Sequence, residues 1–162
     1  MADNTDLPQF VDVRQHGGIA SLALVGERGG RLVGVAADGG EVLVTEGRIL
    51  NWTGVRPVAA GAPELAAATE LFENDQTAAA AVLDLDGLWG RACEGDGEVS
   101  LAGLAEAIQP DADGRLRSAL LRAIVADGLR FQLRASDVRV LSRGEVDERL
   151  RRRTARAAAE VR

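Results

Sequence analysis

The chain has no lysine and no tyrosine, and its 162 residues include a single cysteine and a single histidine. Cys93 has no partner for an internal disulfide, and a multi-cysteine zinc site is excluded. His16 alone cannot form a histidine metal cluster or the usual nucleophile–base pairs, so an enzyme acting with this chain alone is the least supported class. Aromatic residues make up only 3% of the chain, which leaves few platforms for stacking bases of a single strand.

No hydrophobic run approaches the length of a membrane span, and the polar, acidic start differs from a signal peptide. We therefore expect a cytoplasmic protein with no membrane contact. Hydrophobic residues still make up 46% of the chain, enough for a core of Leu, Val, Ile and Ala. The exclusive use of arginine as the basic residue indicates a GC-rich genome more simply than selection for bidentate phosphate contacts at every site.

Charge is distributed unevenly along the chain, whose formal net charge is −6. Residues 1–110 hold 6 arginines against 17 acids, a net of −11, whereas residues 111–162 hold 13 arginines against 8 acids, a net of +5. A localised basic segment is the usual electrostatic signature of nucleic-acid binding. The C-terminal third is therefore where we expect such contacts.

Four apolar runs follow one another early in the chain, and each is followed by a turn that contains glycine. The runs cover residues 19–25, 31–37, 41–45 and 48–53. Short strands joined by glycine turns predict a small β-barrel or SH3-like sheet, which we assign to residues 18–58. Residues 1–17 carry few such signals, so we expect a flexible arm there. Because the chain has no lysine, the glycine-rich turns do not match a phosphate-binding P-loop.

Helical patterns begin after a boundary at residues 54–62. Pro63 suits the first turn of a helix. We assign residues 63–76 to a linker helix, which we expect to run to about Glu73 and to end at Asn74-Asp75-Gln76. The predicted fold class is thus α+β, with the β domain preceding a helical domain.

A winged-helix domain is predicted over residues 77–141. Its expected elements are a helix from Thr77 past Trp89, a helix over 101–108 with Ser100 as N-cap, a helix from about 113 to 126, and strands over 129–134 and 137–141. Two helices followed by a hairpin is the order of elements in a winged helix. The second of these two helices normally enters a nucleic-acid groove. A compact packing module remains the alternative.

An arginine-rich terminal helix over residues 142–162 completes the predicted domains. Ser142 and Glu145 have the spacing of a capping box. The basic run that follows is either a solvated helix or an arm that contacts phosphate, and the pattern leaves both open. We interpret four acids as solvated or capping groups rather than metal ligands: Asp84, Asp86, Asp96 and Glu98. No catalytic or metal-binding residue is predicted.

Several of these segments together resemble the N-terminal, non-catalytic region of bacterial ribonuclease II-like (RNB family) exoribonucleases. The matching segments are Leu88-Trp89, Ser100-Leu101-x-x-Leu104-Ala105-Glu106, Asp127-Gly128-Leu129-x-Phe131, Ser142-x-x-Glu145-Val146-x-Glu148 and the arginine-rich helix. The resemblance implies the accessory part of a Mg²⁺-dependent, hydrolytic 3′→5′ ribonuclease. Its acids and Mg²⁺ would belong to a catalytic domain that follows the arginine-rich helix, so we expect no cofactor in this chain.

The preferred hypothesis is an RNA-binding accessory region. The residues predicted to contact the nucleic acid are Arg115, Ser118 and Arg122 on the outer side of the second helix, Arg130, Arg134 and Arg139 on the wing, and Arg152 and Arg153 on the terminal helix. One alternative is a dimeric DNA-binding regulator whose paired winged helices read two half-sites. The other is a protein-interaction scaffold, which the acidic first 110 residues suit.

Overall fold

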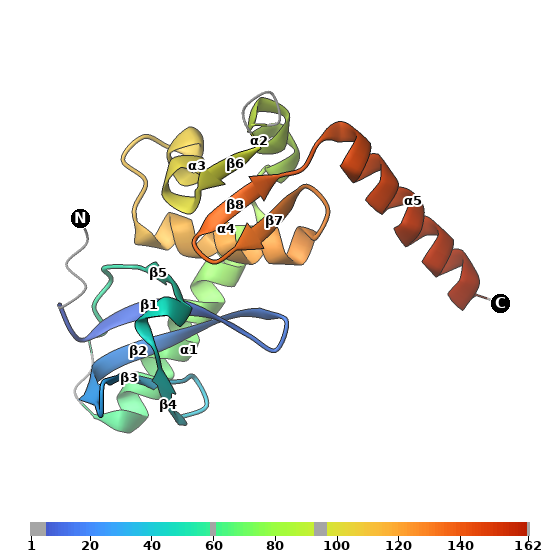
Figure 1. Cartoon of the computed structure of the whole chain (residues 1–162). Coiled ribbons are helices and arrows are strands. Elements are labelled where there is room, and N and C mark those ends of the chain that lie inside the picture. The colour runs from blue at the N-terminus through green and yellow to red at the C-terminus, as the bar shows by residue number, and fades with distance from the viewer. Residues whose placement is uncertain (1–5, 59–60, 93–96, 162) are drawn as a thin grey trace.

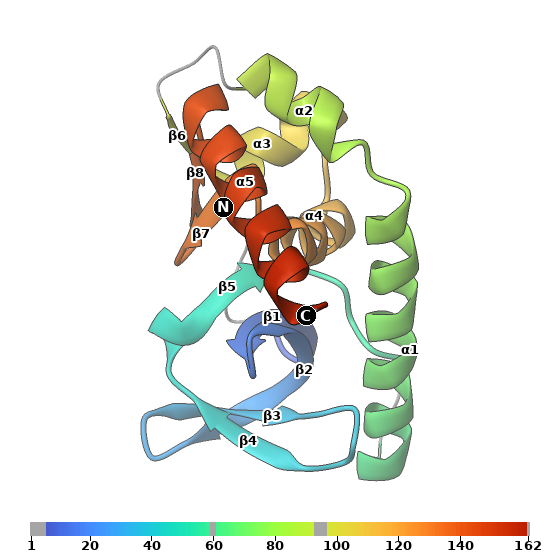
Figure 2. The ribbon, with the colours of Figure 1, turned by 90° about the vertical axis from the view of Figure 1, so that its right-hand side faces the viewer.

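A computed structural model describes residues 6–58, 61–92 and 97–161 and has an α+β fold (Figure 1). An antiparallel five-stranded sheet forms the first unit, and helices with a three-stranded antiparallel sheet form the second. A long helix runs beside both units (Figure 2). The predicted fold class is therefore confirmed at the level of α+β.

The first unit contains β1 Gln9–Gln15, β2 Gly18–Arg28, β3 Arg31–Val35, β4 Glu41–Val44 and β5 Ile49–Trp52, with a 3₁₀ turn over Glu46–Arg48. The sheet order is β4-β3-β2-β1-β5. The described residues form an open sheet, because β4 and β5 lie at opposite edges and do not pair. The four strands predicted between residues 19 and 53 are confirmed.

The prediction of a flexible N-terminal arm is wrong for residues 9–15, because β1 lies inside the sheet between β2 and β5. Val11 and Val13 alternate with polar residues and are buried. The turn to β2 contains His16 at φ 52° and Gly17 at φ 77°, the left-handed backbone that two-residue hairpin turns require. The turn and the alternation together place β1 in the sheet.

Helix α1, Ala62–Ala81, covers one face of the sheet. Leu65 and Phe72 pack with Phe10 of β1, and the Phe10 and Phe72 rings stack with centroids 4.4 Å apart. The predicted break at Asn74-Asp75-Gln76 is wrong, since the helix continues to Ala81. Gln76 is buried, so tertiary packing outweighs the weak helix propensity of Asn and Asp.

The second unit comprises α2 Leu85–Ala92, β6 Glu98–Ser100, α3 Leu101–Ile108, α4 Gly114–Asp127, β7 Phe131–Arg134 and β8 Asp137–Val140, with sheet order β6-β8-β7. Ser100 caps α3 as predicted, since its hydroxyl accepts from Gly103 N–H at 3.0 Å. The three-residue strand β6 was not predicted from the sequence. Trp89 lies in the core of this unit and donates from Nε1 to the Leu141 carbonyl at 2.7 Å.

Helix α5, Arg143–Glu160, begins with the predicted Ser142–Glu145 capping box. Its C-terminal end extends away from the rest of the molecule (Figure 1), and Val146 is its buried residue. Among the described residues, no helix is both long and apolar enough to cross a membrane. Cys93 lies outside the described residues.

Candidate nucleic-acid interface

The side of α4 that the sequence assigned to nucleic acid is buried against the first unit. Arg122 forms an ion pair with Asp12 of β1 at 3.2 Å, and the two side chains are 8% and 0% exposed. Ser21 donates to Asp12 at 2.7 Å and accepts from Arg122 Nη2 at 2.7 Å. Ser118 accepts from Arg122 Nη1 at 2.6 Å. We call these four residues, together with Asn51, the buried network.

Asn51 of β5 extends the buried network to the start of α4. Its amide donates to Asp12 Oδ2 at 2.9 Å and to the Gly114 carbonyl at 3.1 Å, and its Oδ1 accepts from Arg117 Nε at 2.9 Å. A Cβ on Gly114 would lie 1.9 Å from the Thr53 carbonyl oxygen. Only glycine permits this approach, so the two units are fixed against each other at the N-terminal end of α4.

Ser118 and Arg122 therefore cannot serve as exposed contact residues, and that prediction is wrong for both. The helical spacing correctly places Ser118 and Arg122 on the side of α4 that faces away from the core of the second unit. The first unit covers that side. Arg115 is exposed, yet its guanidinium lies 6.0 Å from the centre of the Phe72 ring. It lines a hollow over α1 with Phe10 and Leu71 and does not join the other predicted arginines.

Glu73 of α1 lies beside the buried network. Burial raises the pKa of its carboxyl above the ordinary value of 4.5, and the nearby Arg122 guanidinium offsets part of this effect. In the pH range just above 4.5, the native protein holds a proton that the unfolded chain releases. Ionisation of Glu73 therefore lowers the free energy of unfolding as the pH rises through this range.

Glu73→Gln should remove this pH dependence, because the amide keeps an acceptor oxygen without a charge. We expect the variant to gain stability relative to the wild type between about pH 4.5 and pH 7. Urea unfolding at several pH values measures the difference. Parallel pH profiles for the two proteins would contradict the assignment.

Two of the three predicted wing arginines are held by carboxylates. Arg130 pairs with Asp127 and, at 3.3 Å, with Asp86. Arg139 pairs with Glu145 at 2.8 Å. The Ser142 backbone N–H and the Arg139 guanidinium lower the pKa of the Glu145 carboxyl.

Arg134 is exposed, with no ion pair within the described part of the chain. Among the three predicted wing arginines, it is the one that no carboxylate of the described residues holds. The wing as a whole therefore offers fewer free positive charges than the sequence indicates.

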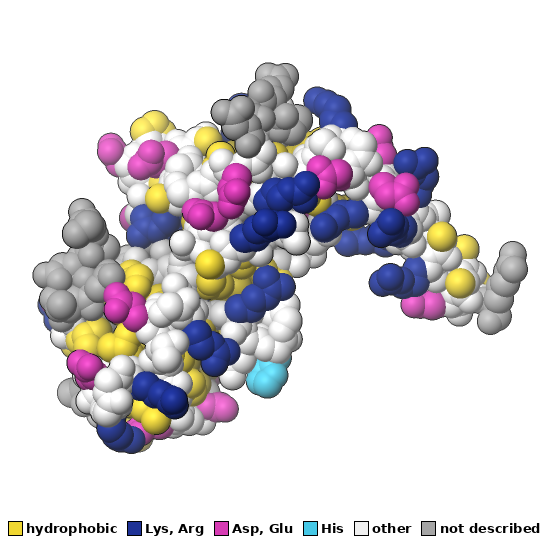
Figure 3. Space-filling view, viewed as in Figure 1, with side chains coloured by type: hydrophobic (Ala, Val, Ile, Leu, Met, Phe, Trp, Pro, Cys, Tyr) yellow, Lys and Arg dark blue, Asp and Glu magenta, His cyan; other side chains and the backbone are white. Residues whose placement is uncertain are grey.

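Five arginines gather instead around the C-terminal end of α4. Two adjoining hollows of about 260 and 310 Å³ share Gly128 and Arg149 in their linings. We call them together the arginine cleft, and its arginines are Arg14, Arg149, Arg152, Arg153 and Arg156. Among the described residues, no carboxylate side chain lines either hollow, although Arg152 pairs with Glu148 of its own helix at 3.2 Å. Figure 3 shows basic side chains gathered where the second unit meets α5.

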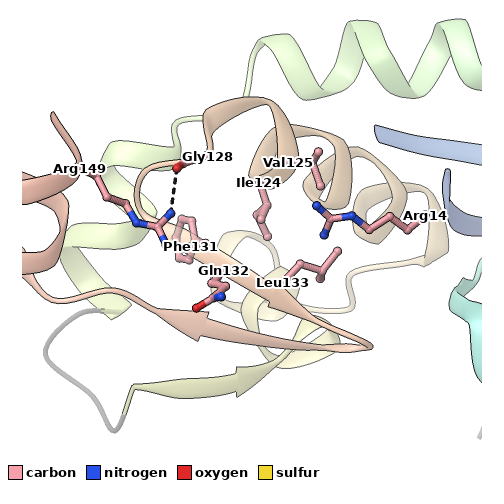
Figure 4. A pocket seen from close by; sticks show the side chains of 8 residues that line it. All are labelled: Arg14, Ile124, Val125, Gly128, Phe131, Gln132, Leu133 and Arg149. Atoms are coloured by element: carbon pink, nitrogen blue, oxygen red, sulfur yellow. Dashed lines mark hydrogen bonds between the residues drawn. The ribbon is translucent and has the colours of Figure 1, made fainter. Parts of the chain in front are cut away.

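The walls of the arginine cleft come from elements far apart in the sequence. Arg14, near the tip of the β1–β2 hairpin, lies across the first hollow from Arg149 of α5 (Figure 4). Ile124 and Val125 of α4 and Leu133 of β7 line the space between them. The cleft thus combines an apolar wall with guanidinium groups on two sides, a geometry that suits an extended polyanion.

Two cleft arginines hold the C-terminal end of α4. Arg149 Nη1 donates to the Gly128 carbonyl at 3.0 Å, and Arg153 Nη2 donates to the Asp127 carbonyl at 3.1 Å. Gly128 caps α4 with φ 63°, a left-handed conformation that favours glycine. Carbonyl groups at a helix C-terminus carry partial negative charge, which these cations stabilise.

Arg152 and Arg153 are the predicted contact residues that the structure brings into the arginine cleft. Arg14 is not among the contact residues predicted from the sequence, because a flexible arm is predicted for residues 1–17. The alternation of Val11 and Val13 before His16-Gly17-Gly18 is the signal that would have placed it in a hairpin.

Two of the four acids considered above have structural partners. Asp84 accepts from the Gly87 N–H at 3.0 Å in the first turn of α2, and Asp86 pairs with Arg130. Asp96 lies outside the described residues. Within those residues, no cluster of His, Cys, Asp and Glu could hold a metal ion.

No family model, curated protein or solved structure matches the chain.

Proposed function

We propose that the chain is an RNA-binding accessory module and that the arginine cleft, rather than α4, contacts the strand. The observation that carries the proposal is the gathering of five guanidinium groups from the hairpin and α5 around hollows that no carboxylate of the described residues lines. Guanidinium groups pair bidentately with phosphate and stay charged at any physiological pH. The cleft therefore has the chemistry of a backbone-binding site.

The proposed architecture is a winged helix preceded by an SH3-like sheet. The order α2-β6-α3-α4-β7-β8 and the sheet order β6-β8-β7 support the first assignment, and the antiparallel sheet with its short strands supports the second. In this arrangement, the first unit covers α4, which is the second of the two helices α3 and α4 that precede the hairpin. Reading of a DNA major groove by that helix is disfavoured, which makes an RNA strand the better ligand.

The resemblance to ribonuclease II-like enzymes gives the module its proposed context. The arginine cleft would bind the phosphate backbone of a single strand without reading its sequence. Phe131, the aromatic residue of the cleft, is only 2% exposed, so it offers no face for stacking a base. Hydrolysis and the Mg²⁺ that it needs would belong to a catalytic domain outside this chain.

Binding of a fluorescent oligouridylate to the chain, followed by anisotropy, tests the proposal. A DNA duplex with the same number of phosphates serves as the comparison ligand. We expect the oligouridylate to bind more tightly, because the cleft follows a backbone and α4 cannot enter a groove. Tighter binding of the duplex would favour the DNA-binding regulator. Failure of both ligands to bind would leave the protein-interaction scaffold.

A further inference from the structure

The contacts that hold α5 against the second unit use two guanidinium groups of the arginine cleft. Arg149 and Arg153 each donate one hydrogen bond to a carbonyl at the C-terminal end of α4. A guanidinium has five N–H donors in one plane. Each of these two arginines can therefore hold its carbonyl and a second acceptor at the same time.

The other attachments of α5 lie at its first turn. Val146 is buried in the second unit, Glu145 pairs with Arg139 at 2.8 Å, and the Arg143 guanidinium lies 5.4 Å from the centre of the Trp89 ring. From Leu150 to Val161 the described residues are exposed. The position of the middle of α5 over the arginine cleft thus depends on Arg149 and Arg153.

We propose that binding of a phosphodiester strand and docking of α5 on α4 are coupled, because Arg149 and Arg153 bridge the α4 carbonyls and the bound phosphates. This inference rests on the proposed RNA-binding function. The carbonyls orient the two guanidinium groups in advance, so less side-chain entropy is lost when a phosphate binds. Among the described residues, Arg152 and Arg156 donate no hydrogen bond to an α4 carbonyl. Arg152 pairs instead with Glu148 of α5 at 3.2 Å, so these two arginines contribute mainly through their charge.

Two charge-conserving double variants separate bridging from charge. Arg149→Lys with Arg153→Lys keeps both positive charges but loses the planar donors that serve two acceptors. We expect it to weaken oligouridylate binding about tenfold, as for the loss of a charged hydrogen bond. Arg152→Lys with Arg156→Lys should weaken binding by no more than about threefold, because the charge that these residues contribute is retained. Arg151→Lys, on α5 but outside the cleft, is the matched control.

Amide hydrogen exchange of residues 146–156 supplies the second measurement. In the wild type, oligouridylate should slow exchange in this segment. In the Arg149→Lys/Arg153→Lys protein, exchange should be faster without RNA and respond less to it, while tryptophan fluorescence verifies the fold. Unchanged α5 exchange in an RNA-bound wild type, or equal affinity losses in the two double variants, would overturn the coupling alone. If the wild type binds no oligouridylate, the proposed function and the coupling both fail.

Discussion

Asp12→Ala is expected to lower the free energy of unfolding by about 3–5 kcal/mol, the cost of leaving a buried charge without its partner. Asp12 is fully buried and accepts hydrogen bonds from Ser21, Asn51 and Arg122. Its loss strands the Arg122 guanidinium at the boundary of the two units. Equilibrium unfolding in urea, followed by tryptophan fluorescence, measures the change.

The exposed ion pair of Asp6 and Arg56 provides the control. These side chains are 60% and 54% exposed, so Asp6→Ala should change stability by less than about 1 kcal/mol. Asp12→Val combined with Arg122→Met removes both buried charges and should recover much of the loss. Equal effects of Asp12→Ala and Asp6→Ala would show that the buried network does not hold the units together.

Reversing two charges in the arginine cleft is expected to lower the affinity for oligouridylate about 100-fold at low salt, because each reversal replaces an attraction by a repulsion. The variant is Arg14→Glu with Arg156→Glu. These residues come from β1 and α5, and within the described residues neither side chain makes a hydrogen bond or an ion pair. Stability should therefore change little.

Arg31→Glu with Arg48→Glu is the matched control for this reversal. Both arginines are exposed on the first unit and lie outside the arginine cleft. The control changes the net charge by the same amount, so it measures the effect of total charge alone. Similar losses of affinity in the two variants would indicate binding that is not localised to the cleft.

Local patterns predicted most of the elements because local chemistry determines them. Ser100 and Ser142 cap helices where their hydroxyls reach first-turn N–H groups, and Gly128 ends α4. The helix break predicted at residues 74–76 is wrong because Gln76 is buried, and its packing stabilises α1 through this segment. Strand β6 is too short to produce a pattern of alternation, and it forms through its pairing with β8.

The candidate site was predictable only in part for a related reason. The basic run on α5 is a local feature, so Arg152 and Arg153 were found. Helical periodicity places Ser118 and Arg122 on one face of α4 but carries no information about what covers that face. Arg14 reaches the cleft through the β1–β2 hairpin, which our sequence analysis does not predict, although Val11 and Val13 alternate with polar residues before His16-Gly17. The arginines that lie together in the tertiary structure thus come from α5 and the β1–β2 hairpin, and not from α4.

The salt dependence of oligouridylate binding tests the central claim most directly. If the five cleft arginines each neutralise about one phosphate of a single strand, the slope of log affinity against log salt should be about −3.5. The Arg14→Glu/Arg156→Glu variant should show a clearly shallower slope. A wild-type slope near zero, or the same slope in the variant, would contradict phosphate binding in the arginine cleft.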